Sequence, residues 1–186
     1  LDSVMRDLSK IIDVRNELHQ VKERVDLEME WNKCCGLVRD LIPQSAIIRM
    51  DFKVKDIFTI RAMVHSIFYN LLSNAIKYKS AKRDLIITGG TRSENGMIRI
   101  DFEDNGIGID LNKYQGSLFK LFKRFHTHVE GRGLGLYLIK SQIESLNGTI
   151  HVSSKVDHGT HFIILIPEVW VPEGSEIHQA SNIHTS

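Results

Sequence analysis

Three polar residues, Asn70, Asn74 and Lys77, are spaced four and three positions apart in the run NLLSNAIKY. These spacings place the side chains on one side of a helix, along the border of its apolar stripe. Asparagine is a poor residue for a helix interior, so two of them at this border favour partners outside the helix. An amide oxygen is a neutral ligand for Mg²⁺, and the Lys77 ammonium can neutralise a phosphate. The pattern indicates a magnesium and phosphate site, and a solvated helix edge is the alternative.

A carboxylate and two glycines, Asp104, Gly106 and Gly108, form the run DNGIG directly after an apolar strand pattern. Asp, Asn and Gly are turn formers, so a plain turn explains this run when it is taken by itself. The same residues can also bind a flat base. A carboxylate accepts a hydrogen bond from the exocyclic amine of adenine, and glycines let the backbone approach the ring closely.

A second glycine-rich run lies directly before a helical pattern and consists of Gly131, Arg132, Gly133, Leu134 and Gly135. Backbone amides at such a junction bind phosphate. A P-loop is excluded, because G-x4-G-K-[ST] does not occur in the sequence. A dinucleotide fingerprint is excluded as well, because its third glycine would fall at position 136, which is Leu136.

Residues 105–131 have no sustained periodicity, and a segment this long is usually functional or disordered. It carries Phe119, Phe122 and Arg124. The two aromatic side chains can act as a latch that packs when a ligand binds, or they are core residues of a short helix. The Arg124 guanidinium can grip terminal phosphates in a bidentate way. We expect residues 109–131 to form a lid whose order depends on nucleotide.

The pattern of apolar residues predicts a mixed α/β domain. Residues 1–25 are expected to form a helix, which either packs on its own domain or belongs to a helical bundle completed by another segment. The other expected helices are 26–41, which begins at Asp26 as N-cap, 61–78 and 135–146. The expected strands are 46–52, 56–60, 84–91, 97–103, 149–154 and 160–166. Residues from Pro167 onward are polar and aperiodic and are expected to form a tail or linker.

Composition narrows the class of protein. The chain has 186 residues, 42% of them hydrophobic and 25% charged, with a net charge of +1. This balance gives no indication of a nucleic-acid or membrane surface. No apolar run reaches the roughly 20 residues that a membrane span needs. The two cysteines, Cys34 and Cys35, are adjacent and are expected to be reduced, as in the cytoplasm, with a strained vicinal disulfide as the alternative.

Taken in order, the four motifs closely resemble those of the catalytic, ATP-binding domain of two-component sensor histidine kinases. NLLSNAIKY resembles the N box of that family, DNGIG its first glycine box, FKLFKRF its F box and GRGLGL its second glycine box. GTHFIILIP (159–167) resembles its closing strand, and the likeness extends over about 26–166. It implies the Bergerat-type ATP-binding fold, an α/β sandwich in which helices cover one face of a mixed, mostly antiparallel sheet. This superfamily also includes gyrase, mismatch-repair ATPases and a heat-shock chaperone.

The resemblance also implies a role for each matching residue. Asn74 corresponds to the magnesium-ligating asparagine, assisted by Asn70, which stands where superfamily hydrolases have a catalytic glutamate. Asn70, Lys77 and Arg124 would be the catalytic set. Asp104 would read adenine, with Tyr78 beside the base and Thr160 supporting the carboxylate through water. The remaining nucleotide contacts would come from Gly106, Ile107, Gly108, Phe119, Phe122, Gly131, Arg132, Gly133, Leu134, Gly135 and Leu136.

The implied function is donation of the γ-phosphoryl group of Mg-ATP to a histidine of a dimerisation domain. The family's acceptor pattern, a histidine followed by Glu or Asp, does not occur in the printed sequence, so residues 1–25 resemble the second helix of that bundle. We expect the isolated chain not to phosphorylate itself. Residues 26–167 would be the catalytic domain and 168–186 a tail. The implied partners are its own dimerisation domain and a response-regulator receiver domain. The parent protein would be a homodimer, either cytoplasmic or anchored in the membrane. A nucleotide-binding sensor module and a superfamily ATPase or serine kinase are the alternatives.

Overall fold

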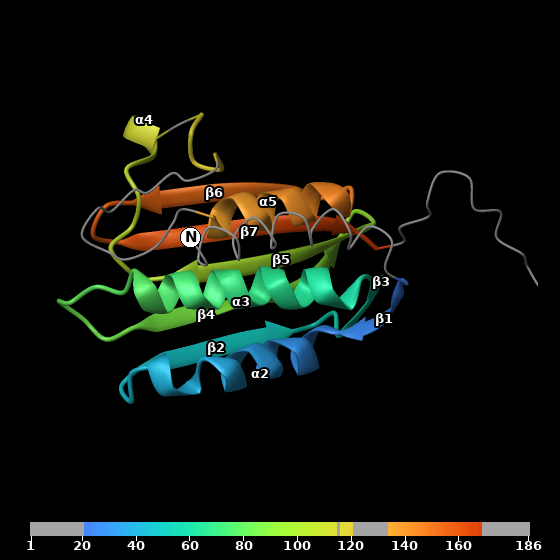
Figure 1. The fold of residues 1–186 in the computed structure, drawn as a ribbon, viewed down its shortest axis with the longest axis horizontal. Coiled ribbons are helices and arrows are strands. Elements are labelled where there is room, and N and C mark those ends of the chain that lie inside the picture. The colour runs from blue at the N-terminus through green and yellow to red at the C-terminus, as the bar shows by residue number, and fades with distance from the viewer. Residues whose placement is uncertain (1–20, 115, 121–133, 169–186) are drawn as a thin grey trace, which may run out of the picture.

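The computed structural model describes residues 21–114, 116–120 and 134–168. Figure 1 shows the order of the elements along the chain. The helices are α2 (Leu27–Leu37), α3 (Arg61–Lys77), α4 (Leu111–Tyr114) and α5 (Gly135–Ser145), with a 3-10 turn at Arg39–Leu41. The strands are β1 (Glu23–Asp26), β2 (Ile47–Phe52), β3 (Asp56–Thr59), β4 (Ile86–Glu94), β5 (Met97–Asp104), β6 (Thr149–Lys155) and β7 (Gly159–Pro167).

Five strands form one mixed sheet in the order β2-β4-β5-β7-β6. Only the β2–β4 pair is parallel, and the other three pairs are antiparallel. The turn between β4 and β5 is Asn95-Gly96, with positive φ at both residues (54° and 74°), and Asn-Gly is a pair that favours such hairpin turns. Within the described ranges, no helix is long and apolar enough to cross a membrane.

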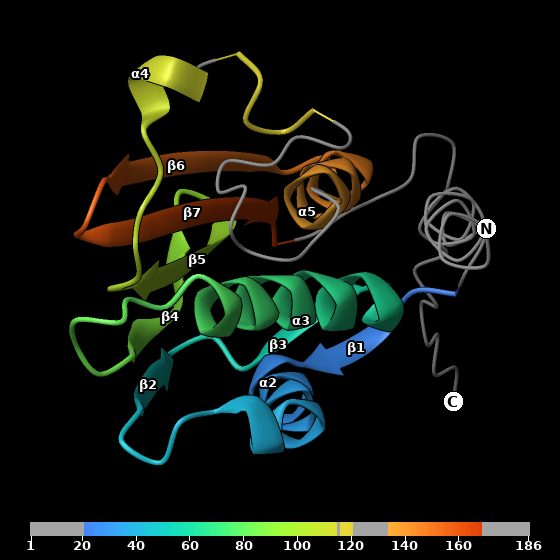
Figure 2. The ribbon, with the colours of Figure 1, turned by 60° about the vertical axis from the view of Figure 1, so that its left-hand side comes forward.

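Helices α2, α3 and α5 lie side by side over the same face of this sheet, as Figures 1 and 2 both show. The predicted fold class is therefore confirmed. α3 buries a wide apolar stripe, as its sequence periodicity predicts. At the centre of the core, the Trp31 ring lies edge-on to Phe68 at 5.6 Å and to Phe102 at 6.0 Å, which joins α2, α3 and β5.

The start of the described chain differs from the prediction. Glu23–Asp26 is a strand, β1, that pairs antiparallel with β3, and Val21 and Lys22 are not helical either. The helix expected over 1–25 is therefore wrong for its last five residues. Val25 is fully buried opposite Ile57, and this cross-strand packing outweighs the weak helical stripe. Residues 1–20 lie outside the described part of the chain. The division at residue 25 between a bundle helix and the catalytic domain stays a prediction.

The second helix begins as predicted and ends earlier. The Asp26 carboxylate accepts a hydrogen bond from the Met29 amide at 2.7 Å, so Asp26 is the N-cap. The helix then stops at Leu37, and a 3-10 turn follows in place of the predicted continuation to 41. Cys34 and Cys35 are both free thiols, and burial raises the pKa of Cys34 to about 12, so this thiol is inert at neutral pH.

Candidate functional site

Asp104 ends β5 and is almost completely buried, with 9% of its surface exposed. It lies opposite Thr160 on β7, and Thr160 lies opposite Ser154 on β6. Directly opposed residues of antiparallel strands point to the same face, so the three form a polar row on the face that the helices cover. The Ser154 and Thr160 hydroxyls are 2.9 Å apart. The role predicted for Thr160 through water stays a prediction.

Burial raises the pKa of Asp104 to about 6, although hydrogen bonds from the Gly106 and Thr160 amides oppose this shift. The Gly106 amide donates to Asp104 Oδ1 at 2.8 Å. Two backbone donors therefore hold the carboxylate in place and leave acceptor capacity for a ligand. Near neutral pH the group is mostly ionised, as an acceptor for an amine must be.

The first glycine run packs tightly against the end of α3. The Ile107 amide donates to the Tyr78 carbonyl at 2.9 Å, and a Cβ on Gly106 would lie only 2.5 Å from that same oxygen. Gly108 has a φ of 67°, a left-handed conformation, and a Cβ there would meet the Lys155 carbonyl. These contacts bring Tyr78 beside the Asp104 loop, and its predicted place beside the base stays a prediction. The Lys77 ammonium lies 5.1 Å from the centroid of the Tyr78 ring.

Gly159, which the sequence analysis did not single out, lies against the Asp104 backbone. Its φ is 117°, and a Cβ on it would collide with the Asp104 carbonyl oxygen. We expect Gly159→Ala to lower the free energy of unfolding by about 3 kcal/mol, from backbone strain plus the collision. Urea denaturation measures this loss.

Gly96→Ala is the matched control for that substitution. Gly96 also has a left-handed φ, 74°, but its Cβ would point into open space. It should cost only about 1 kcal/mol, the strain of the backbone alone. Equal losses in the two variants would show that the approach to Asp104 is not tight.

The two asparagines of α3 face the N-terminus of α5. A Cβ on Gly135 would lie 3.2 Å from Asn74 Nδ2 and 3.4 Å from Asn70 Oδ1. Asn70 Nδ2 donates to the Ser66 carbonyl at 2.8 Å, which turns its oxygen toward Gly135. Among the described residues, the Asn74 side chain has no hydrogen-bond partner. The structure therefore brings the N box together with Gly135, in the described part of the second glycine box.

The first turn of α5 carries no acidic side chain, and Leu134 caps it without a side-chain hydrogen bond. The backbone amides of a helix's first turn have no partner within the helix, and together with the positive dipole end they can attract an anion. Two amide oxygens and a helix N-terminus at one place fit Mg²⁺ and phosphate, because such a donor set adds no negative charge beside the phosphates. Leu136, next on the helix, packs against the main core.

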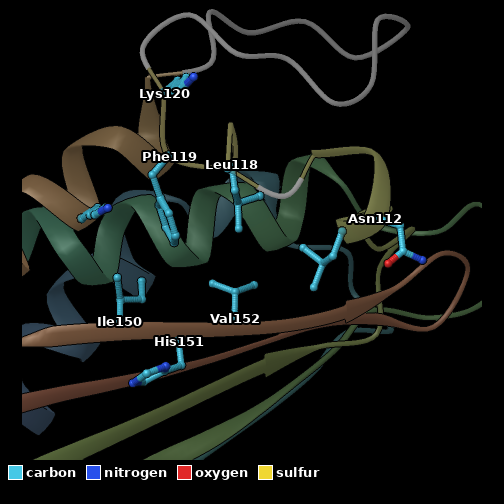
Figure 3. A pocket seen from close by; sticks show the side chains of 10 residues that line it. Asn112, Leu118, Phe119, Lys120, Ile150, His151 and Val152 are labelled. Atoms are coloured by element: carbon cyan, nitrogen blue, oxygen red, sulfur yellow. The ribbon is translucent and has the colours of Figure 1, made fainter.

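Phe119 is the one described aromatic residue of the F box, and it packs under α5. The Lys140 ammonium lies 5.4 Å from the centroid of its ring. Figure 3 shows Phe119 pointing into a cavity of about 530 Å³, with Leu118 beside it and Ile150 and Val152 on the facing strand. Val152 is two positions from Ser154, on the same face of β6. The cavity floor therefore continues from the Asp104 row, although Asp104 itself does not line the cavity.

Part of the predicted site lies outside the described residues. These residues are Phe122, Arg124, Gly131, Arg132 and Gly133, and residues 121–131 of the expected lid belong to the same gap. Their roles stay predictions. Sequence reasoning also missed Ser154 and Arg83, which contact the Asp104 row and the DNGIG loop. A hydroxyl on an edge strand and an arginine in a charged run carry no local signal of such contacts.

Comparison with known proteins gives consistent results. Residues 59–169 match the model of the family described as histidine kinase-, DNA gyrase B- and HSP90-like ATPases. The chain is 38% identical over 115 residues to the sensor protein RprX of Bacteroides fragilis, covering 60% of this chain and 22% of that protein. It is 31% identical over 144 residues to cyanobacterial phytochrome A of Nostoc, covering 76% of this chain and 19% of that protein. The chain thus spans about one fifth of the length of these relatives.

Solved structures show the same fold. The histidine kinase AdeS of Acinetobacter baumannii superposes with a TM-score of 0.71 at 22% identity, covering 90% of this chain and 78% of that one. Full-length ShkA in complex with AMPPNP superposes with a TM-score of 0.72 at 18% identity, covering 89% and 36%. The family match extends from β3 to the end of β7 and contains every predicted site residue. The chain therefore belongs to the histidine kinase-, DNA gyrase B- and HSP90-like ATPase family, as a catalytic ATP-binding domain of the sensor histidine kinase type.

Proposed function

We propose that this chain binds Mg-ATP and places its γ-phosphoryl group for transfer to a histidine on the dimerisation domain of a sensor histidine kinase. One observation carries the proposal: α3 holds two separate groups of polar residues, one suited to each end of a nucleotide. At the C-terminal end of α3, Tyr78 touches the loop that holds the Asp104 carboxylate. One and two turns earlier, Asn74 and Asn70 face the N-terminus of α5.

The residues would divide the work as follows. Asp104 would accept a hydrogen bond from the exocyclic amine of adenine, and Gly106 and Gly108 would let the ring lie against the backbone. Asn74 and Asn70 would hold the magnesium ion, which would supply positive charge to neutralise the phosphates. The α5 amides bind phosphate oxygens, Lys77 adds a positive charge, and Arg124 would reach the γ-phosphate from the lid.

The chemistry at Asn70 favours transfer over hydrolysis. Its amide nitrogen is engaged by the Ser66 carbonyl, and an amide cannot take a proton from water. The catalytic contribution of this domain is then positioning and charge stabilisation, as in phosphoryl transfer generally. The nucleophile would be the histidine of the dimerisation domain, and the phosphoryl group would pass on to a response-regulator receiver domain. We place this activity in the cytoplasm, in a homodimeric parent.

The test is a transfer assay with γ-³²P-labelled ATP and a separately produced dimerisation domain that carries the acceptor histidine. We expect the label to appear on that domain as an acid-labile phosphoryl group, and to need Mg²⁺. Nucleotide binding without any transfer would identify a sensor module instead. Release of inorganic phosphate in the absence of the acceptor domain would identify an ATPase.

A further inference from the structure

Arg83 lies half-buried between α3 and β4, within the charged run Lys82-Arg83-Asp84. Its guanidinium donates three hydrogen bonds, and all three go to main-chain carbonyl groups. Nε donates to the Asn105 oxygen at 2.8 Å, and Nη2 donates to the Gly106 oxygen at 2.8 Å and to the Asp157 oxygen at 2.6 Å. One side chain therefore joins its own segment to the DNGIG loop and to the turn that contains Asp157, through charge-assisted hydrogen bonds.

Two of these carbonyls belong to consecutive peptide units of the loop. In a trans peptide the C=O and the next N–H point in opposite directions, and the described chain has no cis peptide. In the first unit, the Asn105 carbonyl accepts from Arg83, and the Gly106 amide donates to Asp104 Oδ1 at 2.8 Å. In the second unit, the Gly106 carbonyl accepts from Arg83, and the Ile107 amide donates to the Tyr78 oxygen at 2.9 Å.

The third carbonyl closes a ring of contacts. Asp157 lies in the turn between β6 and β7. Its carbonyl accepts from Arg83, and its amide donates to the Ile107 oxygen at 2.8 Å. Gly106 itself has no side chain to fix its orientation, and glycine loses more conformational freedom on folding than any other residue. The orientation of these peptides therefore depends on partners outside the loop, and Arg83 supplies the partner for both carbonyls.

We propose that Arg83 is a positioning residue of the nucleotide site: it orients the peptides on both sides of Gly106, so that Asp104 and Tyr78 keep the geometry that reads adenine. The proposal rests on the proposed function, because the ligand is taken to be an adenine nucleotide. An arginine is needed, since its fork reaches carbonyls of separate segments at once, whereas a lysine ammonium is a single point of charge.

The experiment compares ADP with purine riboside 5′-diphosphate, which has the same phosphates but no exocyclic amine. Calorimetric titration of the wild-type chain should show a preference for ADP of about tenfold or more, since Asp104 accepts the amine. In Arg83→Gln this ratio should fall by about tenfold, because a misplaced carboxylate no longer distinguishes the two ligands. A loss of overall stability alone would weaken both ligands equally.

Lys82→Gln is the matched control. Lys82 is the neighbouring residue and its ammonium lies 3.1 Å from the Asp157 carboxylate, so the variant also removes a positive charge and a contact to the same turn. It touches neither peptide of the loop and should leave the ratio unchanged. Should Arg83→Gln fail to fold, Arg83→Lys keeps the charge without the fork and should show the same fall.

Each outcome is distinct. A wild-type chain that binds neither ligand, or binds both equally, contradicts the proposed function or the role of Asp104, and not the contacts of Arg83. A wild-type preference that persists in Arg83→Gln, or in Arg83→Lys, overturns the positioning role. Equal weakening of both ligands in the arginine variant also overturns it, and leaves Arg83 as a residue that only stabilises the fold.

Discussion

Asp104→Asn should bind ADP about 100-fold more weakly than the wild-type chain and yet be no less stable at pH 7.5. The weaker binding follows because the amide replaces one acceptor oxygen with an N–H donor, which faces the donor amine of adenine. Calorimetric titration with ADP measures the loss. A folded variant with unchanged affinity would contradict the assignment of Asp104 to the base.

The stability of this variant follows from the sign of the pKa shift. Burial raises the pKa of Asp104 from 3.8 to about 6, so the folded state binds the proton more tightly than the unfolded state. The free energy of unfolding therefore falls as pH rises from about 4 to above 6, by at most about 3 kcal/mol. Asp104→Asn removes that cost, although its buried amide hydrogens need partners. Urea denaturation should show the variant gaining most over the wild type at pH 7.5 and least at pH 5.

Asp101 provides the opposite control on the same strand. It lies on the sheet face away from the helices; burial raises its pKa, but hydrogen bonds from Arg99 and His161 outweigh burial and lower it. Its stabilising contribution is therefore present at pH 7.5 and is lost as pH falls below its unfolded pKa. Asp101→Asn should be less stable than the wild type at pH 7.5 and bind ADP normally. Parallel behaviour of the two variants would show that burial on β5, and not the site, sets both results.

Asn74→Ala should lower the rate of phosphoryl transfer to a supplied dimerisation domain by about 1,000-fold, the effect of losing a group that stabilises the transition state. Its amide is the side chain of α3 that faces Gly135 without another partner among the described residues. The variant should fold normally, since an alanine is favourable in a helix. The measurement is the initial rate with labelled ATP at saturating Mg²⁺.

Removal of the metal separates this role from simple nucleotide contact. In EDTA, wild type and Asn74→Ala should bind ADP with similar affinity, and added Mg²⁺ should tighten binding only for the wild type. Ser73→Ala is the control, because the Ser73 hydroxyl donates only to the Asn70 carbonyl of its own helix. A normal transfer rate in Asn74→Ala, or the same metal response in both proteins, would exclude Asn74 as a ligand.

The fold could be predicted where the information is local. The apolar period of Arg61–Lys77, the Asp26 cap and the Asn95-Gly96 turn each express a rule that operates within a few residues, and the structure has all three. The pairing of β1 with β3 could not be predicted, because β1 has only four residues and its partner lies a helix and a strand away. Val25 is the one apolar residue of β1, so the strand has no hydrophobic period that would distinguish it from a helix.

The site shows the same division. Asp104, Tyr78, Asn70 and Asn74 belong to motifs whose residue types suggest their chemistry. The structure places the two asparagines on α3, Tyr78 at its end and Asp104 on β5 beside Tyr78, and their roles stay predictions. Arg83 could not be found in this way. Its acceptors are main-chain carbonyl oxygens, which every residue has. The side chains of Asn105, Gly106 and Asp157 therefore give no sign of these contacts in the sequence.

The strand order of the sheet has a consequence for the synthesis of the protein. β7 lies between β5 and β6, and it is the last described strand to leave the ribosome. Asp104 and its neighbour Thr160 meet across β5 and β7, so any nascent chain that stops before Gly159 has the Asp104 carboxylate but not the strand that encloses it. Such non-local pairing forms late and slowly. Competence to bind nucleotide should therefore arise in one step, once β7 has been synthesised, and the ligand would then favour only chains whose sheet is complete.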